Sequence, residues 1–305
     1  MRSAFPEVAI REGDAVWDAL NNIYESRGSA EFIFVLDEWD FIYHQDFATD
    51  KDKQSFTRFL SILLKDQPYV EMTYMTGILP IAKYSSGSEL NMFFEFSMAT
   101  RETYSAYFGF TDDEVDELYQ RYLRAESKPK ISRNGLEVWY DGYQTMSGRR
   151  LHNPRSVVGA LTFNQPGSYW TSSGPYDELY TYVKQDIDHI REDLGLLMSG
   201  IPVPASVEEY ASTSMNLTTK NEIYSAMVVY GFLSYFLGYV SIPNKELMDK
   251  FADMIRQKTE FGYINRLASE SARMLAATKA GDTETMTRIL EHVHNTESPL
   301  IRYMA

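Results

Sequence analysis

The stretch that decides the fold is Phe32-Ile-Phe-Val-Leu-Asp-Glu-Trp-Asp40. Five apolar residues, most of them strand formers, run directly into two adjacent carboxylates. A continuous apolar run of this length predicts a strand that is buried on both faces of a parallel sheet. Open α/β sheets bind their ligands at the carboxyl ends of their strands, so we expect Asp37 and Glu38 to lie at a functional edge.

The sequence around this strand predicts a small parallel sheet with flanking helices. An amphipathic helix over residues 9–26 precedes it, and a helix over 54–65 and a second strand over 70–76 follow it. Strand, helix and strand in this order predict a parallel crossover connection. The expected fold class is therefore α/β.

The rest of the chain is expected to be mostly helical. Thr111 and Glu114 have the spacing of a capping box, which predicts a helix start. A short strand or wing over 238–243 lies between two predicted helices and favours a winged-helix-like unit, with Asn244 as the cap of the second helix. The further expected elements are a turn at 139–143 and helices over 157–161, 179–197, 224–237, 246–257, 267–280 and 283–293.

Composition limits the classes of function. The net charge of −14 and the pI near 4.9 disfavour binding to nucleic acid and to an anionic membrane. The absence of cysteine excludes disulfides, a thiolate nucleophile and a cysteine-ligated metal site. No signal peptide or apolar segment of spanning length is visible, so we predict a cytoplasmic protein that does not enter the membrane.

Several phrases together resemble the AAA-ATPase-like domain family, whose bacterial members usually carry a PD-(D/E)XK nuclease domain at the C-terminus. Their order and spacing span about residues 30–260. The resemblance implies a partial P-loop-type parallel sheet followed by a mostly helical winged-helix-like domain. The matching phrases are 35–40, 76–78, 108–111, 139–143, 153–156, 169–170, 238–239 and 242–244.

The resemblance also implies a domain plan for a family member that is truncated at both ends. No Gly-x-x-x-x-Gly-Lys-[Ser/Thr] phosphate loop occurs in the sequence, and no nuclease strand follows the last helices. Trp39 and Arg155 depart mildly from the residue types common in the family. The expected parts are a distal half of the ATPase core (1–110), a helical and aromatic connecting segment (111–175), the winged-helix-like domain (176–262) and a helical pair leading to an absent nuclease domain (263–305).

The sharpest candidate site is a Walker B pair. By resemblance, Asp37 holds Mg²⁺ through water and Glu38 is the general base that polarises the attacking water. Thr76, at the end of the second strand, corresponds to a sensor-1 residue that hydrogen-bonds the γ-phosphate or that water. The alternatives are solvated carboxylates at a strand end and a threonine that caps its strand.

The remaining candidates have stronger structural alternatives. Asp40 is a candidate for supporting the metal shell, or caps a local turn. Arg101 and Arg155 are candidates for sensor or finger residues, or are ordinary surface arginines. His152 has the chemistry of a base, but no nucleophile accompanies it in the sequence.

Three functions remain open. The first is an ATPase-like role that requires a phosphate loop supplied in trans, so that ATP and Mg²⁺ are implied by the family and are not expected to bind to this chain alone. The second is a non-enzymatic scaffold, because an incomplete sheet exposes an apolar edge and face to a protein partner or a second copy. The third is a metal-dependent hydrolase that uses Asp37, Glu38 and Asp40.

Overall fold

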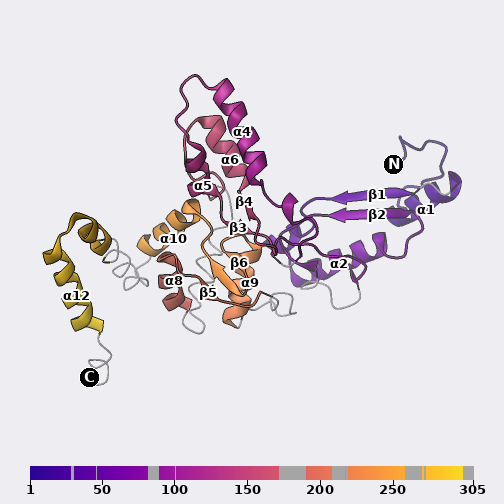
Figure 1. The fold of residues 1–305 in the computed structure, drawn as a ribbon. Helices are drawn as coiled ribbons and strands as arrows, with labels where there is room; N and C mark the ends of the chain where they lie inside the picture. Colours follow the sequence, from indigo (N-terminus) through magenta and orange to yellow (C-terminus); the bar gives the residue numbers. More distant parts are fainter. Residues whose placement is uncertain are drawn as a thin grey trace. The chain divides into compact units, whose positions relative to one another are not determined.

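The computed structural model describes residues 1–28, 31–45, 47–81, 89–99, 101–171, 190–207, 217, 219–257, 270 and 273–297. They form two compact units, an N-terminal unit within Met1–Phe96 and a second unit within Ser97–Val207 and Thr218–Ala305. The fold combines many helices with a small parallel sheet, as the sequence predicted at the level of fold class (Figure 1).

The N-terminal unit is built on two parallel strands. β1 (Phe32–Leu36) pairs with β2 (Val70–Met75), and α2 (Asp50–Leu64) connects them, which confirms the predicted parallel pairing. Figure 1 shows the two arrows side by side and pointing the same way. A single turn of 3₁₀ helix, η1 (Phe41–His44), follows β1.

Two helix starts in this unit differ from the prediction. α1 (Val16–Ser26) begins seven residues later than expected, because the Arg11 amide donates to the Asp14 carboxylate and holds the preceding segment in a turn. α2 begins four residues earlier than expected, because Thr49 and Asp52 form a capping box at its start.

The prediction that β1 is buried on both faces is wrong. Phe32, Phe34 and Leu36 pack against the core that α1 and α2 form, around Leu20, Leu60, Leu63 and Leu64. The alternating residues Ile33 and Val35 are 57% and 71% exposed. Within the described residues the helical layer covers one face only, so an apolar run that suits a two-sided sheet leaves its second side open.

The second unit begins with a helical cluster. The predicted capping box of Thr111 and Glu114 starts α4 (Asp112–Ala125). α4 packs with α5 (Arg133–Tyr140) and α6 (Pro154–Phe163) around Val115, Leu136 and Val157. The turn predicted over 139–143 is partly wrong, because α5 continues to Tyr140 before β3 (Tyr143–Gln144) pairs with β4 (Arg150–Leu151). A short 3₁₀ turn, η2 (Ser105–Tyr107), precedes α4.

The remainder of this unit contains a three-stranded antiparallel sheet. Its order is β5 (Val203–Pro204), β7 (Tyr239–Ser241) and β6 (Ser234–Phe236). The predicted helix over 224–237 is wrong in its second half: α9 (Lys220–Val229) ends where the Phe232 and Leu233 amides turn back to the Met227 carbonyl, and β6 follows. The apolar run contains a helix and a short strand, which periodicity cannot distinguish.

The predicted caps and breaks around the later helices are largely confirmed. The Asn244 side chain accepts from the Leu247 amide at 3.1 Å at the start of α10 (Lys245–Gln257). The chain also breaks at Gly281 before α12 (Thr283–Glu297), as expected. α8 (Ile190–Met198) is the described end of the helix predicted over 179–197; the start of that helix, the boundary predicted near 174–175 and residues 267–269 and 271–272 lie outside the described residues.

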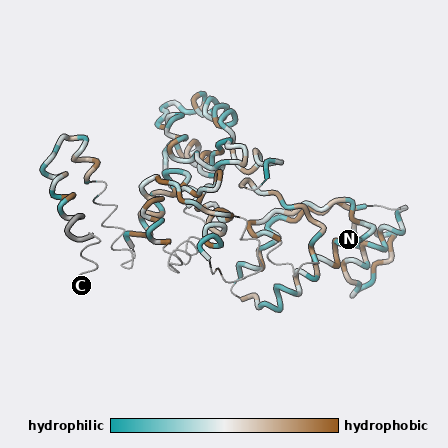
Figure 2. Tube along the Cα trace, turned by 60° about the horizontal axis from the view of Figure 1, so that its bottom comes forward, coloured by the Kyte–Doolittle hydropathy of each residue, from teal (hydrophilic) through white to brown (hydrophobic). Residues whose placement is uncertain are grey.

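A buried carboxylate joins α10 to α6. Glu246 accepts hydrogen bonds from Ser156 Oγ at 2.6 Å, from the Trp170 amide at 2.8 Å and from the Thr171 amide at 3.0 Å. Figure 2 shows hydrophilic and hydrophobic residues alternating along the helices, as expected of elements that bury one side. None of the described helices is long and apolar enough to cross a bilayer.

Candidate functional site

The carboxyl ends of β1 and β2 bring the first two predicted site residues together. The Thr76 hydroxyl donates a hydrogen bond to Asp37 Oδ1. Backbone pairing continues beyond both strands, because the Trp39 amide donates to the Thr76 carbonyl at 2.9 Å and the Thr76 amide donates to the Leu36 carbonyl at 2.9 Å. Asp37 is exposed, so its carboxylate lies at the edge of the sheet and open to solvent.

Glu38 has an unusual backbone conformation. Its φ is 52°, in the left-handed region that a glutamate enters at a cost of about 1–2 kcal/mol. The residue is also exposed. Backbone strain of this kind, held in place by the turn that follows, concentrates at sites where a side chain has a role.

Asp40 has a different environment from Asp37 and Glu38. It is buried and accepts from the Ile78 amide at 2.9 Å and the Leu79 amide at 2.7 Å, and its Oδ2 lies 3.1 Å from His44 Nε2. Burial raises the pKa of Asp40, but these donors outweigh burial and hold the pKa below its ordinary value. The Asp40 side chain does not cap the local turn that follows it; it connects the end of β1 to the loop after β2. The sequence reading missed His44, although its position four residues after Asp40 was a usable signal.

The loop after β2 requires a glycine. A Cβ on Gly77 would lie 2.5 Å from Trp39 Cδ1 and 2.7 Å from Asp40 Oδ1. The Trp39 ring therefore packs directly over the glycine backbone, and a larger residue would displace it. This close packing holds the two strand ends, and with them Asp37 and Thr76, in one arrangement.

The oxygen atoms at this edge suit a partial magnesium and phosphate site. Among the described residues there is no group of three or more His, Asp or Glu that could hold a metal ion by itself. Mg²⁺ keeps several waters and commonly binds through one or two carboxylates together with substrate phosphates, which Asp37 with Thr76 can match. Asp40 fits less well, because it is buried and its Oδ2 already accepts from two backbone amides.

The predicted arginines both belong to the second unit. Arg101 is exposed, and its amide donates to the Ser97 carbonyl at 3.3 Å. Arg155 is exposed in the first turn of α6. Their assignment as sensor or finger residues stays a prediction.

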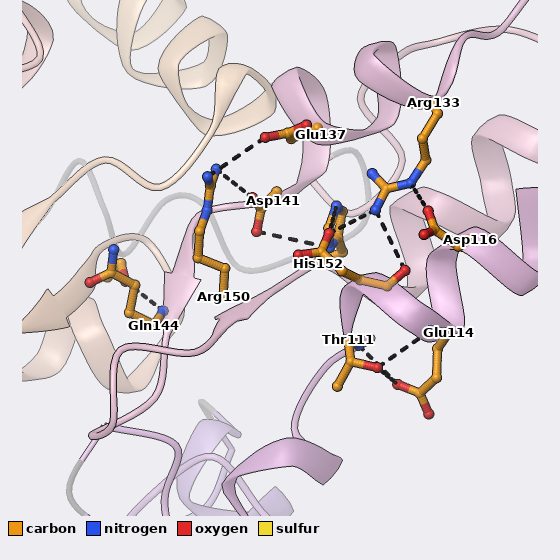
Figure 3. A network of polar contacts seen from close by, with 11 residues as sticks. Thr111, Glu114, Asp116, Arg133, Glu137, Asp141, Gln144, Arg150 and His152 are labelled. Atoms are coloured by element: carbon orange, nitrogen blue, oxygen red, sulfur yellow. Dashed lines mark hydrogen bonds and ion pairs between the residues drawn. The ribbon is translucent and has the colours of Figure 1, made fainter.

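The second unit contains a polar network that the sequence reading did not find (Figure 3). Fully buried His152 lies between two carboxylates: its Nδ1 is 3.8 Å from Asp141 Oδ1, and its Nε2 is 3.9 Å from Asp112 Oδ1. Arg150 pairs with Asp141, and Arg133 donates to Asp112 at 2.7 Å. Residues 112 and 152 are far apart in sequence, and the backbone bridge between Phe110 and His152 and the packing of α4 with α6 bring them together.

Burial shifts the pKa values of His152 and Asp141 in opposite directions. Burial lowers the pKa of His152, while Asp141 acts to raise it and Arg133 to lower it further. Burial raises the pKa of Asp141, against the effects of His152 and Arg150. Both ring nitrogens of His152 and Asp141 Oδ1 are buried without a hydrogen-bond partner among the described residues. The network is closed to solvent at His152, so it is a structural centre and not a candidate site for substrate.

Comparison with known proteins adds no relative: no family model matches this chain, and neither a curated protein nor a solved structure matches it.

Proposed function

We propose that the N-terminal unit is part of a P-loop-type, AAA-ATPase-like core that acts in ATP hydrolysis when a phosphate-binding loop is brought from outside these 305 residues. The observation that carries this proposal is the hydrogen bond between Thr76 and Asp37 at the shared carboxyl edge of two parallel strands. The strained, exposed Glu38 beside them supports it. The family resemblance of the sequence points to the same residues.

Each of these side chains has a distinct role in the proposal. Asp37 would hold Mg²⁺ through water, and Thr76 would orient the Asp37 carboxylate by the hydroxyl hydrogen that it donates to Oδ1. Glu38 would accept a proton from the attacking water. Mg²⁺ bound with ATP would supply charge neutralisation on the phosphates, which none of the residues described at this edge provides.

The test is ATP hydrolysis by the assembly that contains the chain. The tagged protein is isolated from its source cells, and hydrolysis is compared with that of Glu38→Gln and Asp37→Asn. We expect a loss of about 100-fold or more for each, since both groups act on the reacting water or the cation. Glu25→Gln is the matched control, because it changes an exposed glutamate on α1 that has no part in the proposed site. An assembly without ATPase activity, or with activity that neither substitution lowers, would overturn the proposal.

A second measurement uses the chain alone. Calorimetry with Mg²⁺ and ATP is expected to show negligible binding, because in P-loop ATPases the phosphate loop and its lysine make most of the contacts to the phosphates. Micromolar affinity that disappears in Asp37→Ala would show that no outside loop is needed.

A second candidate function is that of an interaction module, and the open face of the β1–β2 sheet favours it. A two-stranded sheet is marginal by itself and gains stability from whatever covers its apolar side. Val35→Glu places a charge on that side and should reduce the binding of a hydrophobic dye. If the unmodified protein binds no dye and sediments as a monomer at high concentration, this function is contradicted.

For the second unit we propose a winged-helix-like arrangement of α9, β6, β7 and α10. The order helix, hairpin and helix supports it, as does the pairing of β6 with β7. α10 carries acidic residues as well as lysines and arginine, so we assign this unit to protein contacts in preference to DNA. Binding of the chain to duplex DNA at physiological salt would contradict that assignment.

A further inference from the structure

The open face of the β1–β2 sheet is a compact apolar surface. Ile33 lies opposite Met72 in the strand register, and Val35 lies opposite Tyr74. These side chains are 57%, 51%, 71% and 58% exposed, in that order. Directly opposed residues of paired strands stand side by side on one face, so the four form a continuous patch, which we call the open face.

Carboxylates border the open face at both ends of the strands. Glu31 and Glu71 lie at the start of β1 and β2 and are exposed. Asp37 and Glu38 follow the end of β1 and are exposed. Residues 1–96 carry sixteen Asp and Glu against eight Lys and Arg, so the acidic border is part of an acidic unit.

Architecture and charge together select the kind of partner. Parallel sheets are covered by helices on both faces, and here α1 and α2 cover the opposite face only. A second copy of the chain would bring its own acidic border against this one, which like-charge repulsion disfavours. A helix with an apolar stripe and flanking lysine or arginine would bury the open face and pair with the carboxylates of its border.

We propose that the open face binds an amphipathic helix of another protein whose apolar stripe is flanked by lysine or arginine. This inference rests on the interaction function proposed above and adds the chemistry of the partner. Apolar burial supplies affinity, and the carboxylates supply orientation and selectivity.

The experiment is a selection from displayed helical peptides against the full 305-residue chain. Each peptide has about 18 residues, or five helical turns, a constant leucine stripe, and either lysine or glutamate at every flanking position. We expect lysine to be enriched at the flanking positions. The best peptide is then titrated by fluorescence anisotropy at low and high salt, with weaker binding expected at high salt because exposed charges are screened.

Variants separate the patch from its border. Val35→Glu should lower the affinity for the selected peptide at least about tenfold. The double change of Glu31→Lys and Glu71→Lys should lower this affinity about tenfold and should favour glutamate-flanked peptides instead. Val138→Glu is the matched control, because it changes a half-exposed valine on α5 and should leave affinity unchanged. Circular dichroism checks folding, and Val35→Thr replaces Val35→Glu if the latter unfolds.

The possible outcomes distinguish the two proposals. Peptides that need Val35 but show no preference for lysine would overturn the partner chemistry and leave the interaction function in place. Peptides that bind regardless of Val35, or no binding at all, would overturn both. A dimer in sedimentation that Val35→Glu dissociates would show that a second copy occupies the face, and would overturn the inference in that way.

Discussion

The edge at Asp37 and the network at His152 both contain aspartates, but these carboxylates are exposed at the edge and one of them is buried in the network. Asp37 and Glu38 are exposed, with one side-chain hydrogen bond from Thr76. His152 and Asp141 are buried; Arg150 pairs with Asp141, and Arg133 pairs with the Asp112 that lies beside His152. A buried charge must be matched within the fold, whereas an exposed one stays available to a ligand. Substitutions should therefore affect stability in the network and function at the edge.

The largest effect is expected from Gly142→Ala, beside the buried Asp141. Gly142 has a φ of 118°, and an added Cβ would lie 1.8 Å from the Pro243 carbonyl oxygen. We expect a loss of about 4 kcal/mol or more, because two backbone segments would have to separate. Chemical denaturation measures the loss. Gly195→Ala is the control, since nothing lies within 4 Å of its added Cβ, and an equal loss there would contradict the explanation.

Asp40→Ala should follow in size and would sharpen the contrast within the N-terminal unit. It leaves the buried Leu79 amide and the part-buried Ile78 amide without this acceptor, for an expected loss of about 3 kcal/mol. Asp37→Asn should change stability by less than about 0.5 kcal/mol, since the residue is exposed. Because the pKa of Asp40 is lowered in the folded state, its stabilisation is present above the ordinary carboxyl range near 4 and disappears as the pH falls through the folded pKa. Similar losses of unfolding free energy for Asp40→Ala and Asp37→Asn would contradict a structural role for Asp40 that Asp37 lacks.

His152 should make stability depend on pH in the mildly acidic range. Its pKa is lowered in the folded state, so below about pH 6.5 the unfolded chain binds the proton first and folding loses free energy. Melting temperatures measured from about pH 7.5 down to about pH 5.5 should fall more steeply for the natural protein than for His152→Gln. Parallel curves for the two proteins would show that His152 does not titrate in this window.

The smallest effect tests strain at the exposed edge. Glu38→Gly removes the left-handed strain and adds unfolded-state entropy, for an expected net gain of about 0.5 kcal/mol. The same change should abolish ATP hydrolysis by the assembly. A loss of stability would mean that the glutamate side chain supports the turn, and the edge would then resemble the buried network more than we propose.

Local signals predicted local structure well in this chain. The capping box at Thr111 and Glu114 and the cap at Asn244 were legible because each depends on residues three positions apart. The parallel pairing of β1 with β2 followed from strand, helix and strand in sequence. The sequence also placed Asp37 and Thr76 at the ends of these two strands, but it did not predict the hydrogen bond between them.

The predictions that were wrong or missing concern residues whose neighbours in the fold are distant in the sequence. An apolar run can have the same amino-acid sequence whether helices cover one face of its sheet or both. The open face at Ile33 and Val35 was therefore not predictable. The apolar run after Lys220 could not show where the helix ends and β6 begins. His152 could not be connected to Asp112 by spacing, because the contact depends on how Phe110 and His152 pair.

The sequence by itself therefore determined the caps, the parallel crossover and the placing of Asp37, Glu38 and Thr76 at a strand edge. Each of these depends on contacts between near neighbours or between the two ends of one connection. Only the tertiary structure decided which carboxylates stay exposed and which face of the sheet stays open. Burial is a property of everything packed around a residue, and for Asp37 and Asp40, three positions apart, it made one an available ligand and the other a part of the fold.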